Sequence, residues 1–191
     1  LGVPEIYRYG NWGTQTAQPT HLFHTYNFNR HKFVYSFAAD PFLYVEEGRG
    51  YSKFFVGSKY FKTIYPQSFS RKEKIDKDKS WRHCNTSPFY DRLFYDRYSN
   101  LYYRIALHGV TPDDYDNGSK FGAFSIIIIN DNFKKVGEVY FDKSIAKNYC
   151  LKHIVVTREG LFILRNDIYS EQPNFVSLER FVVKRISKEN I

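Results

Sequence analysis

The chain has 191 residues, enough for one domain with a sizeable core, and 19% of them are aromatic, with 17 Tyr and 18 Phe. This composition favours β structure, and no apolar run approaches the roughly 20 residues that a membrane-spanning helix needs. The net charge is +8, but the basic residues are spread along the chain and mixed with acids, which argues against a nucleic-acid binder.

Strands separated by turns are predicted for the first half of the chain. Residues 1–19 are rich in Gly, Gln, Thr and Pro and predict an irregular segment. Strands are expected at 5–9 (short), at 20–28, in a hairpin over 31–47 with its turn at 38–41, and at 52–56 and 61–65. The two strands of the hairpin and the strands at 52–56 and 61–65 make a four-stranded antiparallel unit. Residues 66–88 form a long polar connection, of a kind that is often functional.

Two further units follow along the chain. In the second, strands are expected at 91–96, 101–107, 123–130 and 135–141, with a hairpin turn at 131–134. The stretch FSIIIIND is apolar on both faces, which predicts a strand covered on both sides. In the third, strands are expected at 152–157, 161–167 and 176–186, with Gly160 in a tight turn. No long amphipathic helix is predicted; residues 144–150 allow one short turn.

The two cysteines, Cys84 and Cys150, are too few for a disulfide framework. They could pair once, but neither lies in a CxxC motif, so we expect two buried or idle thiols. The chain has no Met and begins at Leu1 without a recognisable signal peptide. We therefore expect a processed chain or a fragment.

A hairpin pattern recurs three times, at 31–47, 91–107 and 152–167, with a spacing of about sixty residues. Four antiparallel strands per repeat are typical of a β-propeller. The prediction is an all-β, single partial propeller domain over 1–191, as half of a six-bladed ring. The expected blades cover 20–66, 88–142 and 150–187. The missing blades would come from the rest of the protein or from a second chain.

The stretches DRLFYDRYSNLYYRIAL, FSIIIINDNFKKVGEVYF and HIVVTREGLFILR resemble blades of TolB-like six-bladed propeller lipoproteins of Bacteroidetes. More narrowly, they resemble a domain-of-unknown-function group within that set. The resemblance covers roughly residues 20–187 and implies that the chain is the C-terminal half of a ring. It also implies a cell-envelope protein (periplasmic or outer-membrane) whose lipidated N-terminal cysteine is absent from this chain. It implies no established substrate.

The connections predict one end of the sheets with short turns and one with long loops. The long ones are 66–90, 108–122, 143–151 and 168–175. Binding groups concentrate on loops that a rigid scaffold positions. Candidate ligand-binding residues at the long-loop end are Arg30, His31, Trp81, Arg82, His83, Lys152 and His153. Aromatic rings with cations suit an anionic or sugar ligand.

Each of these signals has a structural alternative. Trp81 could anchor a loop, Arg82 could pair with a nearby acid, and the His residues could be satisfied locally. The Asp-rich segment 113–117 lacks the spacing of a calcium loop and predicts a surface turn. No catalytic residue, metal-ligand set or cofactor fingerprint is recognisable.

Two functions are weighed. The first is a non-catalytic envelope propeller that binds a carbohydrate or protein partner through its long-loop face and does not bind nucleic acid. The alternative is a propeller hydrolase or lyase that acts on sugars or lactones with a metal in the central channel.

Overall fold

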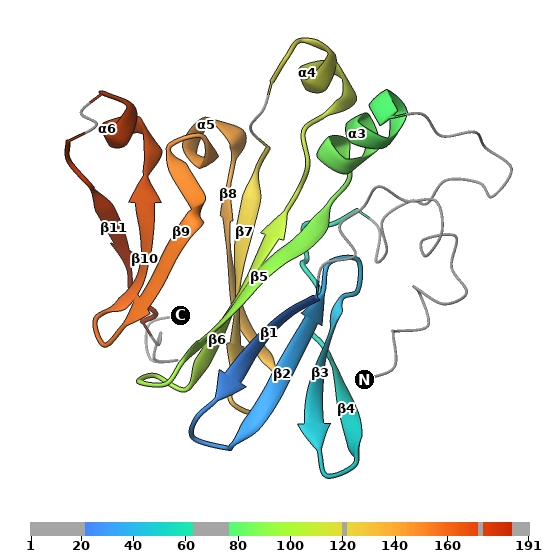
Figure 1. Ribbon diagram of the computed structural model, residues 1–191, viewed down its shortest axis with the longest axis vertical. Coiled ribbons are helices and arrows are strands. Elements are labelled where there is room, and N and C mark those ends of the chain that lie inside the picture. The colour runs from blue at the N-terminus through green and yellow to red at the C-terminus, as the bar shows by residue number, and fades with distance from the viewer. Residues whose placement is uncertain (1–21, 63–76, 120–121, 172–173, 185–191) are drawn as a thin grey trace, which may run out of the picture. The chain divides into compact units, whose positions relative to one another are not determined.

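The computed structural model describes residues 22–62, 77–119, 122–171 and 174–184 (Figure 1). These residues form an all-β fold of three antiparallel sheets, of four, four and three strands, with short helices in the connections. The predicted all-β class is therefore confirmed. Residues up to Ala146 belong to one compact unit with two sheets, and those from Lys147 onward belong to a second unit with one.

Each sheet is a meander of strands that follow one another in the chain. Sheet A consists of β1 (Leu22–Asn27), β2 (Lys32–Phe37), β3 (Phe42–Glu47) and β4 (Gly50–Phe55). Sheet B consists of β5 (Phe89–Asp96), β6 (Leu101–Leu107), β7 (Phe124–Asn130) and β8 (Lys135–Phe141). Sheet C consists of β9 (Tyr149–Thr157), β10 (Gly160–Arg165) and β11 (Leu178–Phe181). The helices are α3 (Lys77–Thr86), α4 (Pro112–Asp116), α5 (Lys143–Ala146) and α6 (Asn166–Glu171).

The predicted positions of the four strands of sheet B are confirmed. Strand β7 is buried along most of its length, as its apolar sequence predicts. Sheet A requires a correction. The strand predicted at 20–28 is its first strand, so the hairpin 31–47 supplies its second and third strands. Of the strand predicted at 61–65, Phe61 and Lys62 are not in a strand and the rest lies outside the described residues, as does the strand predicted at 5–9.

The turn that follows the first strand shows which strands of sheets A and B correspond to each other. The side-chain oxygen of Asn27 accepts hydrogen bonds from the backbone N–H of Asn29 and Arg30, both at 2.9 Å. Asp96 repeats this pattern in sheet B with the N–H groups two and three residues further on, at 2.9 and 3.2 Å. Four residues after each acceptor, His31 and Asn100 have φ values of 52° and 56°. Both turns are Asx turns, so β1–β2 corresponds to β5–β6.

One core joins sheets A and B. Its buried side chains include Val34, Leu43 and Val45 from sheet A and Tyr102 and Ile127 from sheet B. Since strand side chains alternate between the two faces, these residues define the face of each sheet that is turned toward the other. The two sheets of the first unit are therefore packed face to face.

Arg104, on β6, is fully buried and crosses this core. Its guanidinium donates hydrogen bonds to Ser36 Oγ at 2.9 Å and to the carbonyl oxygens of Phe37, Asp40 and Pro41 at 3.3, 2.6 and 3.1 Å. Its central carbon lies 3.6 Å from the centroid of a tyrosine ring. Because the planar guanidinium has five N–H donors, one side chain satisfies several acceptors in the β2–β3 turn of sheet A.

The ten-residue helix α3 was not predicted. It buries none of its residues, so its sequence lacks the apolar stripe by which a surface helix is recognised. Among the described helices, none is long and apolar enough to span a membrane. Among the described residues, Cys84 and Cys150 form no disulfide.

Candidate functional site

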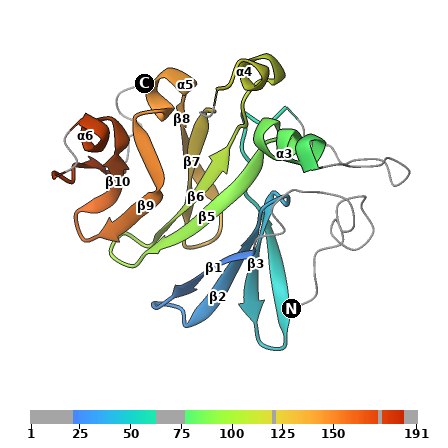
Figure 2. The same ribbon diagram turned by 45° about the horizontal axis from the view of Figure 1, so that its top comes forward.

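The two ends of sheet B differ, as Figure 2 shows. The β5–β6 and β7–β8 connections at one end are short turns. At the other end lie α3, α4 and α5. Arg82 of α3 pairs with Asp116 of α4 through both of its terminal nitrogens. Lys143 of α5 pairs with Asp114 of α4 at 2.9 Å. For sheet B the predicted division into a short-turn end and a long-loop end is therefore confirmed.

A pocket of about 500 Å³ opens at the long-loop end. Its walls come from the segment after β4, from the connection between β6 and β7, and from the end of β8 with the start of α5. Two glycines shape the β6–β7 connection. A Cβ on Gly109, which has a φ of +70°, would stand 2.7 Å from the backbone of Thr86, and a Cβ on Gly122 would stand 2.6 Å from Gly109 O. Glycine at both positions therefore allows the backbone segments around the pocket to approach closely.

An aromatic cluster forms one wall of the pocket. The rings of Tyr60 and Tyr140 lie 4.7 Å apart, and each residue is about two-fifths exposed, at 41% and 42%. The imidazole of His108 lies edge-on to Tyr140 and to Phe61, with centroid distances of 5.1 Å in both cases. The two tyrosines are thus the exposed part of a packed cluster, and their ring faces are held in place by the rings beneath them.

His108 is half-buried, and its Nε2 lies 2.6 Å from Oγ of the fully buried Ser125. Burial lowers the pKa of the imidazole, and the nearby Glu138 carboxylate opposes this effect only in part. The ring is therefore neutral at neutral pH.

The charged groups of the pocket compensate one another. The Asp114 carboxylate accepts hydrogen bonds from Lys143 Nζ at 2.9 and 3.0 Å, and this interaction, followed by that with Thr111, lowers its pKa. Asp142 accepts from the hydroxyl and backbone N–H of Ser144, at 2.5 and 2.8 Å, and its pKa is lowered, chiefly by the hydroxyl. Both carboxylates are therefore ionised at neutral pH.

Of the seven residues that the sequence suggested, the five in the first unit do not come together. Trp81, Arg82 and His83 lie on α3 at the long-loop end but are not part of the pocket wall. Trp81 is 65% exposed, Arg82 is paired with Asp116, and His83 Nδ1 lies 3.3 Å from a serine hydroxyl one turn further along. The alternative reading of Arg82, as the partner of a nearby acid, is confirmed.

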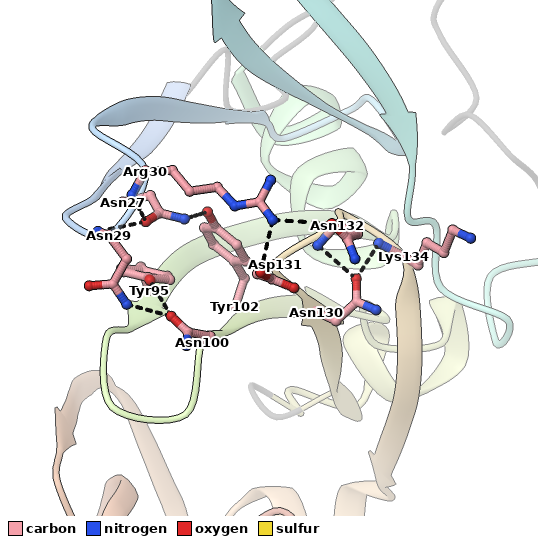
Figure 3. A network of polar contacts seen from close by, with 10 residues as sticks. All are labelled: Asn27, Asn29, Arg30, Tyr95, Asn100, Tyr102, Asn130, Asp131, Asn132 and Lys134. Carbon is pink, nitrogen blue, oxygen red and sulfur yellow. Dashed lines mark hydrogen bonds and ion pairs between the residues drawn. The ribbon is translucent and has the colours of Figure 1, made fainter.

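Arg30 and His31 lie at the short-turn end, contrary to expectation. Figure 3 shows Arg30 reaching the β7–β8 turn, where it donates to Asp131 at 2.8 Å and to Asn132 at 3.1 Å. The cause is the shifted repeat: residues expected to precede a first strand belong to the turn between the first and second strands. The turn itself docks on sheet B through Asn27, which donates to the Tyr102 hydroxyl.

Lys152 and His153 lie on β9 in the second unit, and both are exposed. They fall where the pairing of β9 with β10 shifts register, between the pairs Ile163–Ile154 and Leu164–Cys150. The segment 113–117 carries α4, capped by the Thr111 hydroxyl, in place of the predicted turn. Within the part of the chain that the structure describes, no three His, Cys, Asp or Glu side chains are grouped as metal ligands.

Comparison with known proteins identifies one family. The pattern of the family described as "Domain of unknown function (DUF4221)" matches residues 3–140. A crystal structure of a DUF4221 family member from Bacteroides vulgatus is similar over 84% of this chain, with 25% sequence identity and a TM-score of 0.65. The chain spans less than half of that protein, 46% of its length. No curated protein matches.

Proposed function

This chain belongs to the DUF4221 family of proteins, whose domain has no known function, and from that premise we propose that it is a non-catalytic binding module for a neutral, polyhydroxylated ligand of the carbohydrate class. The pocket at the long-loop end carries the proposal. Its volume of about 500 Å³ is within the range of small-ligand sites, roughly 300–1,000 Å³.

The walls of the pocket suit a sugar. The partly exposed rings of Tyr60 and Tyr140 provide apolar surface for the C–H groups of a pyranose. The ionised Asp142 can accept hydrogen bonds from sugar hydroxyls, and Lys143 can donate to them. A few polar groups around an apolar wall fix the orientation of a ligand in such sites.

The charge balance favours a neutral ligand over an anionic one. The charged residues of the pocket lining are two lysines, Lys62 and Lys143, and two aspartates, Asp114 and Asp142. Lys143 already pairs with Asp114, and His108 carries no charge at neutral pH. Asp142 would repel an anion placed beside it. An anionic ligand would therefore meet at least as much negative as positive charge.

The architecture that we propose for the whole protein is a TolB-like six-bladed propeller, with this chain as its C-terminal half and the sheets as consecutive blades. The repeated Asx turns, the face-to-face packing of sheets A and B, and a length of 46% of the Bacteroides relative support it. A cell-envelope location through a lipid anchor outside this chain rests on the resemblance of the sequence to such lipoproteins.

Saturation-transfer NMR of the full chain with a panel of neutral mono- and disaccharides tests the binding proposal. At least one saccharide is expected to show saturation transfer, and Tyr140→Ala is expected to weaken its binding about tenfold or more, because the ring face is lost. Tyr98→Ala, at an exposed tyrosine of the short-turn end, is the matched control and should bind as the parent chain does. The proposal fails if the panel gives no signal, if both variants bind equally, or if inorganic phosphate or citrate binds more tightly than every saccharide.

A further inference from the structure

The segment 57–62, which follows β4, brings Tyr60 to the pocket at the long-loop end of sheet B. The ring of Tyr60 lies 4.7 Å from that of Tyr140 on β8, and the two partly exposed rings form the aromatic wall toward the ligand. Tyr60 belongs to no helix or strand, so no ladder of backbone hydrogen bonds fixes it. Its position therefore depends on the contacts that hold the segment.

A buried carboxylate joins this segment to sheet B. The side chain of Glu138 is only 1% exposed, although β8 is an outer strand of the sheet. Its Oε1 accepts from the Ser58 hydroxyl, and its Oε2 accepts from the backbone N–H of Lys59 at 2.9 Å. A carboxylate that is removed from water requires donors of this kind. Because both donors belong to the segment 57–62, one side chain of β8 holds the segment.

Lys135, three residues before Glu138, completes the arrangement. Its ammonium donates to Glu138 Oε2 at 2.5 Å and to the carbonyl oxygen of Gly57 at 2.9 Å. The cation thus compensates the buried carboxylate and also binds the first residue of the segment. Removal of one partner from such a pair leaves the other buried without compensation.

The connection extends to Tyr60 itself. Ser58 Oγ, which donates to Glu138, also accepts from the backbone N–H of Tyr60 at 3.2 Å. Tyr140 lies two residues after Glu138 in β8, and residues with this spacing point to the same face of a sheet. The strand therefore carries one ring of the pair directly and holds the other through the carboxylate of Glu138 and the hydroxyl of Ser58.

We propose that Glu138 is a positioning residue of the saccharide site, a role that rests on the function proposed above. Glu138 does not line the pocket. It raises the affinity for the ligand by holding the Tyr60 ring beside the Tyr140 ring before the ligand arrives. A group that is already ordered loses less conformational freedom on binding, which leaves more of the contact energy as affinity.

A second anchor lets the role of Glu138 be separated from attachment of the whole segment. The hydroxyl of Tyr90 accepts from the Ser58 N–H at 3.0 Å, and the Tyr90 ring lies 5.0 Å from that of Phe61. These contacts do not involve the carboxylate. We therefore expect a change at Glu138 to alter the turn that presents Tyr60 while the segment stays attached.

Saccharide titrations of Glu138→Gln, followed by saturation-transfer NMR of the full chain, test the role. Glutamine keeps the shape but replaces one accepting oxygen by an NH2 donor, and both oxygens of Glu138 face donors. Binding should weaken about fivefold or more. Glu47→Gln is the matched control and should bind as the parent chain does. Glu47 also accepts from a serine hydroxyl and pairs with a lysine, at 3.7 Å, but in the β3–β4 turn, away from the pocket.

Two further variants distinguish positioning from a general loss of structure. Ser58→Ala interrupts the connection to Tyr60 but keeps the pair of Lys135 with Glu138, and it should also weaken binding. In chains that carry Tyr60→Ala, Glu138→Gln should change the affinity less than about twofold, because it acts through the missing ring. An equal loss with and without Tyr60 overturns the proposal. Circular dichroism confirms that each variant is folded.

A measurement without ligand keeps this role distinct from the proposed function. Nuclear Overhauser contacts between the rings of Tyr60 and Tyr140 are expected in the parent chain and in Glu47→Gln, and they should weaken or disappear in Glu138→Gln. Unchanged ring contacts in Glu138→Gln overturn the role of Glu138, even if a saccharide binds. If no saccharide binds the parent chain, the proposed function fails, and with it the effect of Glu138 on affinity.

Discussion

Replacement of Arg104 by methionine should destabilise the first unit strongly while leaving its packing volume nearly unchanged. The side chain is fully buried between sheets A and B, and its guanidinium donates to Ser36 Oγ and to three carbonyl oxygens of the β2–β3 turn. Methionine fills similar space in the core but donates no hydrogen bond. The change therefore isolates the hydrogen bonds of Arg104 from its packing.

The magnitude follows from the acceptors that lose a donor. The carbonyls of Phe37 and Pro41 also accept from backbone N–H groups, at 3.2 and 3.0 Å, and keep those bonds. Ser36 Oγ and Asp40 O lose the donor that the structure shows for them. Each buried acceptor left without a donor costs about 1–3 kcal/mol, and relief from burying a charge offsets part of this. We expect a loss of about 2–4 kcal/mol for Arg104→Met and roughly 2 kcal/mol more for Arg104→Ala, which also leaves a cavity.

Urea denaturation followed by circular dichroism measures the change, with thermal unfolding as a second readout at about 2–4 °C per kcal/mol. Arg97→Met is the control: Arg97 lies in the exposed β5–β6 turn, with its guanidinium 5.7 Å from the ring of Phe28, and its loss should cost less than about 0.5 kcal/mol. If Arg104→Met unfolds at the same urea concentration as the parent chain, the hydrogen bonds of Arg104 do not hold sheet A to sheet B.

Two further predictions concern pH and a turn. Because burial lowers the pKa of His108 in the folded protein below its ordinary value of 6.5, the unfolded chain takes up the proton first. The stability that is present above pH 6.5 is therefore lost as the pH falls below that value, and thermal unfolding between pH 7.5 and 5 should show a smaller decrease in His108→Gln. Gly160→Ala should lower the melting temperature more than Gly48→Ala, because both residues have positive φ, 135° and 59°, but only a Cβ on Gly160 would collide, at 2.4 Å from Phe181 O. Equal losses in the two glycine variants would contradict the steric explanation.

The repeated hairpins were predictable from the sequence, but the strand with which each sheet begins was not. Alternating apolar residues and turn residues locate β2, β3 and all of sheet B, since these signals are local. Alternation does not tell which of two adjacent hairpins opens a sheet, and for this reason Arg30 and His31 were expected at the wrong end. The turn sequences YNFNRH and YDRYSN show where each sheet begins, because Asn27 and His31 have the same spacing as Asp96 and Asn100.

No local sequence pattern predicted the pocket. Its aromatic wall is formed by Tyr60, His108 and Tyr140, which are far apart in the chain and belong to no local motif. In the sequence, only Gly109 and Gly122 of the β6–β7 connection indicated that backbone segments approach closely. Helix α3 was missed for a related reason, since it has no buried face and is joined to α4 through the Arg82–Asp116 pair.

The sequence by itself determined the all-β class, the antiparallel meanders and the division of sheet B into a short-turn end and a long-loop end. These depend on residues a few positions apart, where side-chain alternation and turn chemistry act directly on the backbone. Only the tertiary structure decided which strand opens sheet A, that Arg104 joins two sheets and that a pocket lies among the long loops. Each of these depends on contacts between residues distant in the chain, and no local pattern specifies them.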